Sequence, residues 1–241
     1  MCKKTVKRIC RKVIGFWLKD KLEHFENFYL GLLGYSLARK SWCATRITST
    51  ASLMTIDGYP RSANSFAVKA FMQAQGGFVR VGNHTHSPAN LIRGVKLGKP
   101  VLLVIRDPKD AILGYCAWCD ETEGELPNAL KAVQLKAFAR RYVQFHKKLV
   151  PYLDSIVVAD FQDVVTDYGR VIGRVNEKYD ETFKLFEHTE ENQQALFDNA
   201  PRHLSPSNGR KNIKKAYEQE WDKIKGSVLI ANAYNLYDLM T

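Results

Sequence analysis

The sequence contains no apolar run long enough to cross a membrane. Its longest candidate, 28–38, falls well short of the roughly 20 residues that a spanning helix needs, so we expect no transmembrane anchor. The basic start of the chain resembles the first part of a signal peptide, but the apolar stretch 13–18 stops at Lys19 and no small-residue cleavage site follows. We therefore expect a cytoplasmic protein rather than a secreted one.

Cysteine is scarce as well. The chain has five cysteines, an odd number, and their wide spacing does not form a disulfide framework in a chain of this size, which favours a reducing compartment. Cys116 and Cys119 form a C-x-x-C pair, but the surrounding stretch is apolar and no second pair completes a zinc site with four ligands. We expect both to be buried as small hydrophobic residues, and we expect no metal.

The chain also lacks internal repeats, low-complexity tracts and any linker rich in Gly, Ser or Pro. With 241 residues, of which 45% are apolar and 25% charged, it is long enough to bury one substantial core. We expect residues 1–45 to form a helical, amphipathic extension packed on or beside a single domain of residues 46–241. A helix lying on a membrane surface is the alternative for this extension.

What the sequence has in excess is positive charge, with a formal net charge of +11. Such a balance favours an anionic partner: nucleic acid, an acidic membrane, or a multiply charged nucleotide or glycan. The charge alone does not choose among them.

Short apolar segments alternate with helical patterns along the domain. We expect strands at 53–56, 77–81, 101–105 and 155–159, and helices at 66–75, 89–97, 109–118, 127–149 and 167–179. The run 101–105 is aliphatic throughout, which is typical of a strand covered on both faces of a parallel sheet. The pattern predicts an α/β fold with three layers, an open parallel sheet flanked by helices.

The loop between the first strand and its helix, residues 58–65, has the makings of an oxyanion site. Small residues permit close backbone approach, Asn64 and Ser65 place donors at the helix start, and Arg61 adds a fixed charge. Ser and Asn also cap ordinary helices, which is the structural alternative. The loop lacks the G-x-x-x-x-G-K-[ST] form of a nucleoside-triphosphate P-loop.

The segment Tyr59-Pro60-Arg61-Ser62-Ala63-Asn64-Ser65-Phe66 resembles the 5′-phosphosulfate loop of the sulfotransferase family, usually Y-P-K-S-G-T-T-W. The resemblance implies a P-loop-NTPase-like sulfotransferase fold. It also implies the cofactor 3′-phosphoadenosine 5′-phosphosulfate, with adenosine 3′,5′-bisphosphate as product. Arg61 takes the place of the basic residue beside the bridging oxygen. The cofactor-binding residues implied by this loop are Arg61, Ser62, Ala63, Asn64, Ser65 and Phe66.

A second match follows the third strand, where Arg106-Asp107-Pro108-Lys109-Asp110 resembles the family's motif for the 3′-phosphate. The resemblance assigns Arg106 to that phosphate. The serine that the family carries eight residues later falls on Gly114 here, so another group must replace its hydroxyl.

Between these motifs, His84-Thr85-His86-Ser87-Pro88 resembles the K-T-H-x-P segment that carries the general base of cytosolic sulfotransferases. His86 aligns with the base and His84 with the lysine. Imidazole suits this role because it titrates near working pH and can take the proton of an acceptor hydroxyl. An H-x-H pair could also begin a metal site, but no third ligand with suitable spacing stands out.

Two weaker similarities complete the implied site. Phe161 lies where the family places an aromatic residue against adenine; a core aromatic is the alternative. Residues 207–212 resemble the late basic loop that closes over the 3′-phosphate, with Arg210 and Lys211 as candidates; a solvated basic loop is the alternative.

The resemblance carried by these motifs implies in-line transfer of a sulfuryl group to a hydroxyl or amine, with His86 and Arg61 as catalytic residues. The acceptor is a small molecule or a glycan that the sequence does not identify, and no nucleic-acid partner is expected. Two alternatives stay open: a P-loop-type kinase of a small substrate, and a non-catalytic basic module that binds nucleic acid or a membrane.

Overall fold

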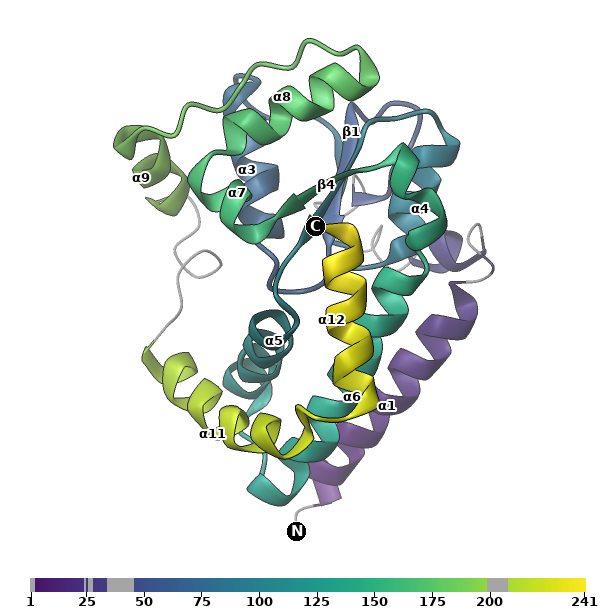
Figure 1. Ribbon diagram of the computed structural model, residues 1–241, viewed down its shortest axis with the longest axis vertical. Helices are drawn as coiled ribbons and strands as arrows, with labels where there is room; N and C mark the ends of the chain where they lie inside the picture. The colour runs from purple at the N-terminus through teal and green to yellow at the C-terminus, as the bar shows by residue number, and fades with distance from the viewer. Residues whose placement is uncertain (1–2, 24, 26–27, 34–45, 199–207) are drawn as a thin grey trace.

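A computed structural model describes residues 3–23, 25, 28–33, 46–198 and 208–241 (Figure 1). Four parallel strands form one open sheet in the order β2-β1-β3-β4. The strands are β1 (Met54–Gly58), β2 (Val81–Asn83), β3 (Val101–Ile105) and β4 (Val157–Asp160). The predicted α/β class with an open parallel sheet is confirmed.

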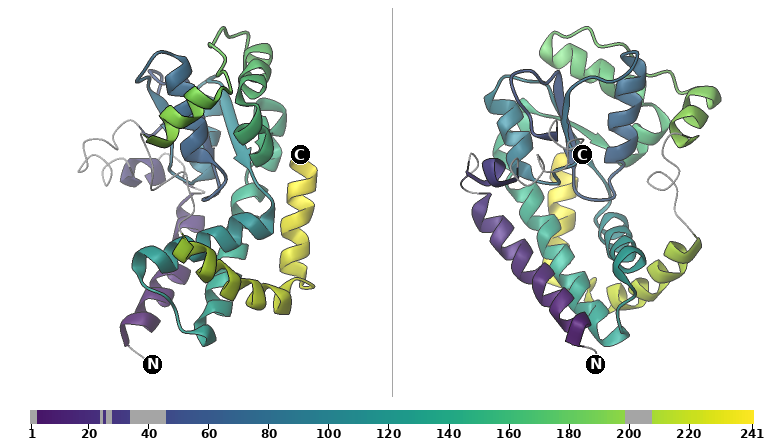
Figure 2. Two further views of the ribbon diagram at one scale, coloured as in Figure 1. Left: turned by 90° about the vertical axis from the view of Figure 1, so that its left-hand side faces the viewer. Right: turned by 180° about the vertical axis from the view of Figure 1, so that it is seen from behind.

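Helices cover both faces of this sheet (Figures 1 and 2). In chain order they are α1 (Lys3–Leu22), α3 (Asn64–Ala74), α4 (Pro88–Lys96), α5 (Pro108–Glu123), α6 (Asn128–Lys147), α7 (Phe161–Thr166), α8 (Tyr168–Tyr179), α9 (Glu190–Asp198), α11 (Asn208–Ile224) and α12 (Val228–Met240). A 3₁₀ helix, η2 (Val150–Ser155), precedes β4.

The two cores alternate along β3, as expected for a strand buried on both faces. Val101, Leu103 and Ile105 pack into the core formed with α4, α5, α6, α11 and α12. Leu102 and Val104 pack into the core formed with α3, α7 and α8. The sheet is therefore the middle of three layers.

Two strand predictions differ from the structure. The strand predicted at 77–81 was wrong, because Gly76 and Gly77 adopt positive φ angles of 87° and 139° as the chain leaves α3, and β2 begins only at Val81. The strand predicted at 155–159 begins later, at Val157, because the preceding residues form η2. Cys116 and Cys119 are buried free cysteines of α5, as predicted.

The N-terminal helix α1 runs beside α6 toward the sheet (Figures 1 and 2). Phe16 packs edge-on against Phe138 of α6 with ring centroids 5.2 Å apart, and Lys12 pairs with Glu123 at 3.1 Å. None of the described helices is long and apolar enough to cross a membrane. Much of the remaining extension, 34–45, lies outside the described residues.

The strand order creates a switch point between β1 and β3. The chain leaves β1 through α3 toward β2, whereas it leaves β3 through α5 and α6 toward β4, and α3 and α5 cover opposite faces. In open α/β sheets, loops that diverge in this way leave a crevice at the carboxyl ends of the strands, where ligands bind. The last residue of β1, Gly58, has to be glycine, because a Cβ there would lie 2.1 Å from the carbonyl oxygen of Val104.

Candidate functional site

A cavity of about 830 Å³ is lined by residues that follow the carboxyl ends of all four strands. Every site residue predicted from the sequence except Ser62 lines it: Arg61, Ala63, Asn64, Ser65, Phe66, His86, Arg106, Phe161, Arg210 and Lys211. The structure therefore brings together motifs that lie up to 150 positions apart in the sequence.

The lining is strongly cationic. Among the described lining residues, Asp110 is the one carboxylate. Six are basic: Arg46, Arg61, Arg106, Arg210, Lys211 and Lys214. Like charges held this close repel one another unless an anion separates them. Burial and the neighbouring Arg210 and Arg106 lower the pKa of Arg61 to about 10, so it stays charged at neutral pH. The cavity is therefore suited to an anionic ligand.

The loop after β1 has the backbone shape of an anion site. Arg61 and Ala63 adopt left-handed conformations with φ of 73° and 66°, a region that favours glycine. No side chain of the described residues caps the start of α3. The first amide groups of α3 are thus left for a ligand, as at other anion-binding helix starts.

Three of the cofactor-binding residues predicted from this loop are buried or engaged within the protein itself. The amide of Asn64 donates to the carbonyl oxygens of Gly58 and Tyr59 at 3.3 and 3.0 Å, so it closes the loop instead of offering its donors to a ligand. Ser62 is fully buried, and its hydroxyl has no hydrogen-bond partner in the described part of the chain. Phe66 packs against Tyr168 and Phe186 in the core.

Arg106 is held by contacts on several sides. Its guanidinium lies 3.9 Å from the ring centre of Phe161, donates to the carbonyl oxygen of Arg61 at 3.0 Å, and lies 3.6 Å from Asp110. Such stacking is worth about 0.5–2 kcal/mol and fixes the plane of the charge. The ring face of Phe161 therefore helps to position the guanidinium of Arg106.

The late basic pair lies on a helix and not on a loop. The structure describes this segment from residue 208 onward, where α11 begins, so Arg210 and Lys211 lie in its first turn. Residues 199–207, which precede α11, lie outside the described residues. Arg210 donates to Glu121 of α5 at 2.8 Å, which ties α11 to α5, while Lys211 is exposed. Lys214, one turn further, pairs with Asp110 at 2.6 Å.

His86 presents one ring nitrogen to the cavity in the form a general base requires. Its Nδ1 lies 2.9 Å from the carbonyl oxygen of Gly58, which only accepts, so Nδ1 carries the proton. Burial, opposed by this hydrogen bond and aided by nearby Lys19 and Arg46, lowers the pKa of His86 to about 4. The ring is neutral at pH 7, and its Nε2 is an acceptor.

His84 is arranged differently. Its Nδ1 lies 2.7 Å from Asn83 Oδ1 and its Nε2 lies 3.0 Å from the hydroxyl of Ser65. Since Asn83 donates its amide to Val81, its Oδ1 accepts from Nδ1 of His84, and Nε2 of His84 accepts from Ser65. Both ring nitrogens of His84 are therefore engaged within the protein.

Asp57, a residue that the sequence analysis missed, holds residues 84–88 in place, which we call the histidine segment. Its buried carboxylate accepts from the amides of Gly58, Thr85 and His86 and from the Thr85 hydroxyl, at 2.8 to 3.1 Å. His84 adopts a left-handed conformation with φ of 49°, and His86 one with φ of 46°. Strained backbone of this kind costs about 1–3 kcal/mol per residue and persists only where surrounding contacts determine it. The sequence signal that could have revealed Asp57 is a carboxylate inside a strand that is otherwise buried.

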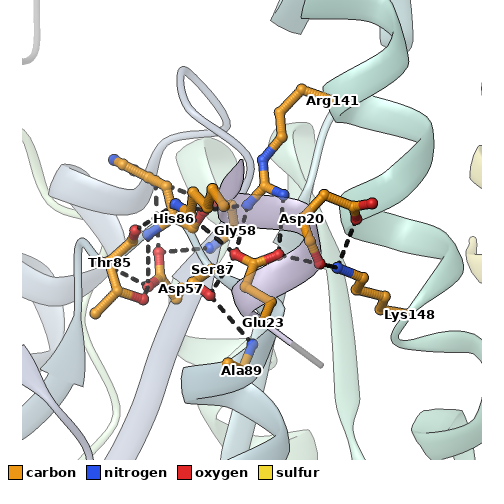
Figure 3. Close-up of polar contacts among 11 residues, drawn as sticks. Asp20, Glu23, Asp57, Gly58, Thr85, His86, Ser87, Ala89, Arg141 and Lys148 are labelled. Carbon is orange, nitrogen blue, oxygen red and sulfur yellow. Dashed lines mark hydrogen bonds and ion pairs between the residues drawn. The ribbon is translucent and has the colours of Figure 1, made fainter. Parts of the chain in front are cut away.

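A second buried carboxylate links α1 to the same segment (Figure 3). Figure 3 shows Glu23 between Arg141 and Lys148 of the α6 region and Ser87 of the histidine segment. Arg141 binds Glu23 with two nitrogens at 2.9 and 2.7 Å, and Ser87 donates to it at 2.6 Å. Arg141 also donates to the carbonyl oxygen of His86 at 3.2 Å. The histidine segment is thus held by Asp57 of β1, by Glu23 and Lys19 at the end of α1, and by Arg141 of α6.

Lys19 of α1 touches the segment directly. Its ammonium donates to the carbonyl oxygens of Thr85 and His86 at 3.2 and 2.8 Å. Burial and the nearby Arg141 lower the pKa of Lys19 to about 7. The N-terminal extension was predicted to pack on or beside the domain, and the contacts of α1 reach the backbone of His86 itself.

Gly114 occupies the position where a serine was missing from the motif. A Cβ added there would lie 3.5 Å from Cβ of Arg61, so α5 passes close to that side chain. The same helix brings Tyr115 and Trp118 to the cavity, with their rings stacked at 6.1 Å. These aromatic residues were also missed, although the spacing of three between Tyr115 and Trp118 on a helix could have indicated a shared face.

In the described part of the chain, no group of three or more His, Cys, Asp and Glu side chains could hold a metal ion. Comparisons with protein families and with curated proteins found no match to this chain.

Proposed function

We propose that the protein is a sulfotransferase of the P-loop-like fold that uses 3′-phosphoadenosine 5′-phosphosulfate. The observation that carries the proposal is one cationic cavity that combines an uncapped helix start with Arg61, a second anchored cation at Arg106, and a neutral histidine with a free acceptor nitrogen. A donor with separate 5′ and 3′ phosphate groups fits two such centres of positive charge.

Each residue then has a distinct task in transfer. The amides at the start of α3 bind the 5′-phosphosulfate, and Arg106 with Lys211 binds the 3′-phosphate. His86 Nε2 takes the proton of the acceptor hydroxyl or amine as the acceptor atom bonds to sulfur. Arg61 stabilises the negative charge that collects on the bridging oxygen as its bond to sulfur breaks. Fixed donors already in place lower the barrier without reorganising.

A thermal shift assay tests this function against its kinase rival. Adenosine 3′,5′-bisphosphate at about 100 times its Kd should add roughly 2.7 kcal/mol to folded-state stability. For a chain of this size that corresponds to a rise in Tm of roughly 5–10 °C. Stabilisation by ATP with Mg²⁺ and none by the bisphosphate would replace the proposal by a kinase.

The Arg106→Ala variant is expected to weaken binding of adenosine 3′,5′-bisphosphate by roughly tenfold to a hundredfold, because a hydrogen bond to a charged group contributes about 1.5–3 kcal/mol. Binding of adenosine 5′-monophosphate, which lacks the 3′-phosphate, should change little. Isothermal titration with both nucleotides measures the difference. Equal losses for both would show that Arg106 acts through its bond to the loop at Arg61, and the 3′-phosphate assignment would fail.

A further inference from the structure

The N-terminal helix carries most of the net charge of the protein. Of its 20 residues eight are Lys or Arg and one is Asp, so α1 has a formal net charge of +7 out of +11 for the whole chain. Among the α1 cations whose side chains the structure describes, Lys12 pairs with Glu123, and Lys19 contacts the backbone of Thr85 and His86. The first three turns of α1 supply a dense positive charge: Lys3, Lys4, Lys7, Arg8, Arg11 and Lys12.

The same region exposes an unusual share of large apolar side chains. Of the twelve large hydrophobic residues exposed in the described part of the chain, six lie between residues 14 and 32, with 48 to 69% of their surface accessible. We call this set the N-terminal apolar surface: Ile14, Trp17, Leu18, Phe25, Phe28 and Leu32. Exposed apolar side chains that are scattered singly need no explanation, but a cluster of this kind marks an interaction site.

The helix divides these residues by face. Ile14, Trp17 and Leu18 follow the spacing of three and four that places residues on one side of a helix, and all three are exposed. Phe16 and Glu23 lie on the other side, against α6 and its Arg141. The contacts of α1 with α6 therefore do not involve the exposed side chains of Ile14, Trp17 and Leu18.

We propose that this surface docks the protein on an anionic membrane, with α1 lying in the plane of the interface. The chemistry of the surface fits that partner: apolar and aromatic side chains insert at the boundary of the acyl chains, while clustered Lys and Arg are attracted by acidic headgroups. A protein partner would match the apolar residues but would not by itself account for the concentration of charge on one helix. The proposal is independent of the sulfotransferase function.

Co-sedimentation of the full chain with vesicles tests the proposal. Vesicles of 30% phosphatidylserine in phosphatidylcholine should bind the protein at least tenfold more tightly than vesicles of phosphatidylcholine alone, because each basic residue near an anionic surface contributes roughly fivefold to binding. The preference should shrink in high salt. Neutralising Lys3, Lys4, Lys7 and Arg8 together to Gln should remove most of it.

A matched pair of variants tests the apolar contribution. Trp17→Ser combined with Leu18→Ser should weaken binding to the anionic vesicles by tenfold or more. Phe78→Ser combined with Leu239→Ser, which changes two side chains of similar exposure elsewhere, should leave binding unchanged. Circular dichroism checks that all variants are folded.

Two results would overturn the proposal. One is absence of binding to the phosphatidylserine vesicles, or binding that the Trp17 and Leu18 changes do not weaken. The other is a dimer in sedimentation velocity that these same changes convert to a monomer without any vesicle binding, which would assign the surface to a second copy of the chain. Both leave the nucleotide-binding test unaffected, because that test uses the cavity.

Discussion

Replacing Glu23 by alanine is expected to lower the free energy of unfolding by about 3–5 kcal/mol, the usual cost of removing one partner of a buried ion pair. The Glu23 carboxylate is inaccessible to solvent and faces Arg141, whose side chain is only 3% exposed. Without Glu23, both Arg141 and Lys148 would keep their charges in a partly buried place with less compensation. Urea denaturation, read at the midpoint of the transition, measures the change.

An exposed ion pair serves as control for this experiment. Asp222 and Lys225 lie 3.1 Å apart with both side chains more than 60% exposed, so Asp222→Ala should cost less than about 1 kcal/mol. If the alanine variant of Glu23 does not fold, Glu23→Gln keeps the shape of the side chain and still removes the charge. Losses no larger than that of Asp222→Ala for either Glu23 variant would show that the buried network does not stabilise the protein.

The difference in stability between the parent protein and Glu23→Gln should depend on pH with a definite sign. Burial alone would raise the pKa of Glu23, but the hydrogen bonds and charge of Arg141, with Lys19, lower it below its ordinary value of 4.5. A carboxyl whose pKa falls on folding stabilises the protein above its unfolded pKa and loses that effect as pH falls through the folded value. The stability gap between the parent protein and Glu23→Gln should therefore be full at neutral pH and close on acidification below about pH 4.5.

The His86→Asn variant is expected to bind adenosine 3′,5′-bisphosphate nearly as well as the parent and to transfer sulfuryl about 10²–10⁴ times more slowly, the range typical of lost general bases. Asparagine can still donate to the carbonyl oxygen of Gly58, as Nδ1 of His86 does, but it cannot take a proton at neutral pH. Single-turnover rates with saturating donor, measured once a competent acceptor is known, separate chemistry from binding.

His84→Asn is the internal control, because both ring nitrogens of His84 are engaged with Asn83 and Ser65. It should alter donor binding more than the rate of transfer. Parental rates for His86→Asn together with slow transfer by His84→Asn would move the base two residues along the chain.

The pH dependence of transfer by the parent protein gives a further expected result. Burial lowers the pKa of His86 to about 4 in the free protein, and a bound anionic donor should raise that pKa. The fall of kcat on the acidic side of its pH profile should therefore occur at higher pH than the corresponding fall of kcat/KM.

The sequence predicted well those features that depend on neighbouring residues. The aliphatic run 101–105 marked β3 at its observed bounds, since a strand buried on both faces needs no alternation. The motif loops were placed at the strand ends because the order of strand, loop and helix is local. The β2 prediction failed because Gly77 was read as the start of a strand, although Gly76 and Gly77 have positive φ angles where the chain leaves α3.

What could not be predicted depends on contacts between distant parts of the chain. Asp57 lies 28 residues before Thr85, and Glu23 lies 64 residues before Ser87, so neither spacing forms a local pattern. The role of Asn64 was missed for a different reason: a polar side chain at a helix start can serve either the loop or a ligand, and only the positions of the Gly58 and Tyr59 carbonyl groups decide.

The pairing of Glu23 with Arg141 also sets an order of events during synthesis. The two residues are 118 positions apart, so a chain elongating at about 5–20 residues per second exposes Glu23 on the order of ten seconds before its partner exists. Strands β1, β2 and β3 are complete by residue 105 and can pair in that interval. The backbone of His86 receives its hydrogen bond from Arg141 only when α6 arrives, so the segment around His86 reaches its final shape at least 55 residues after it is synthesised.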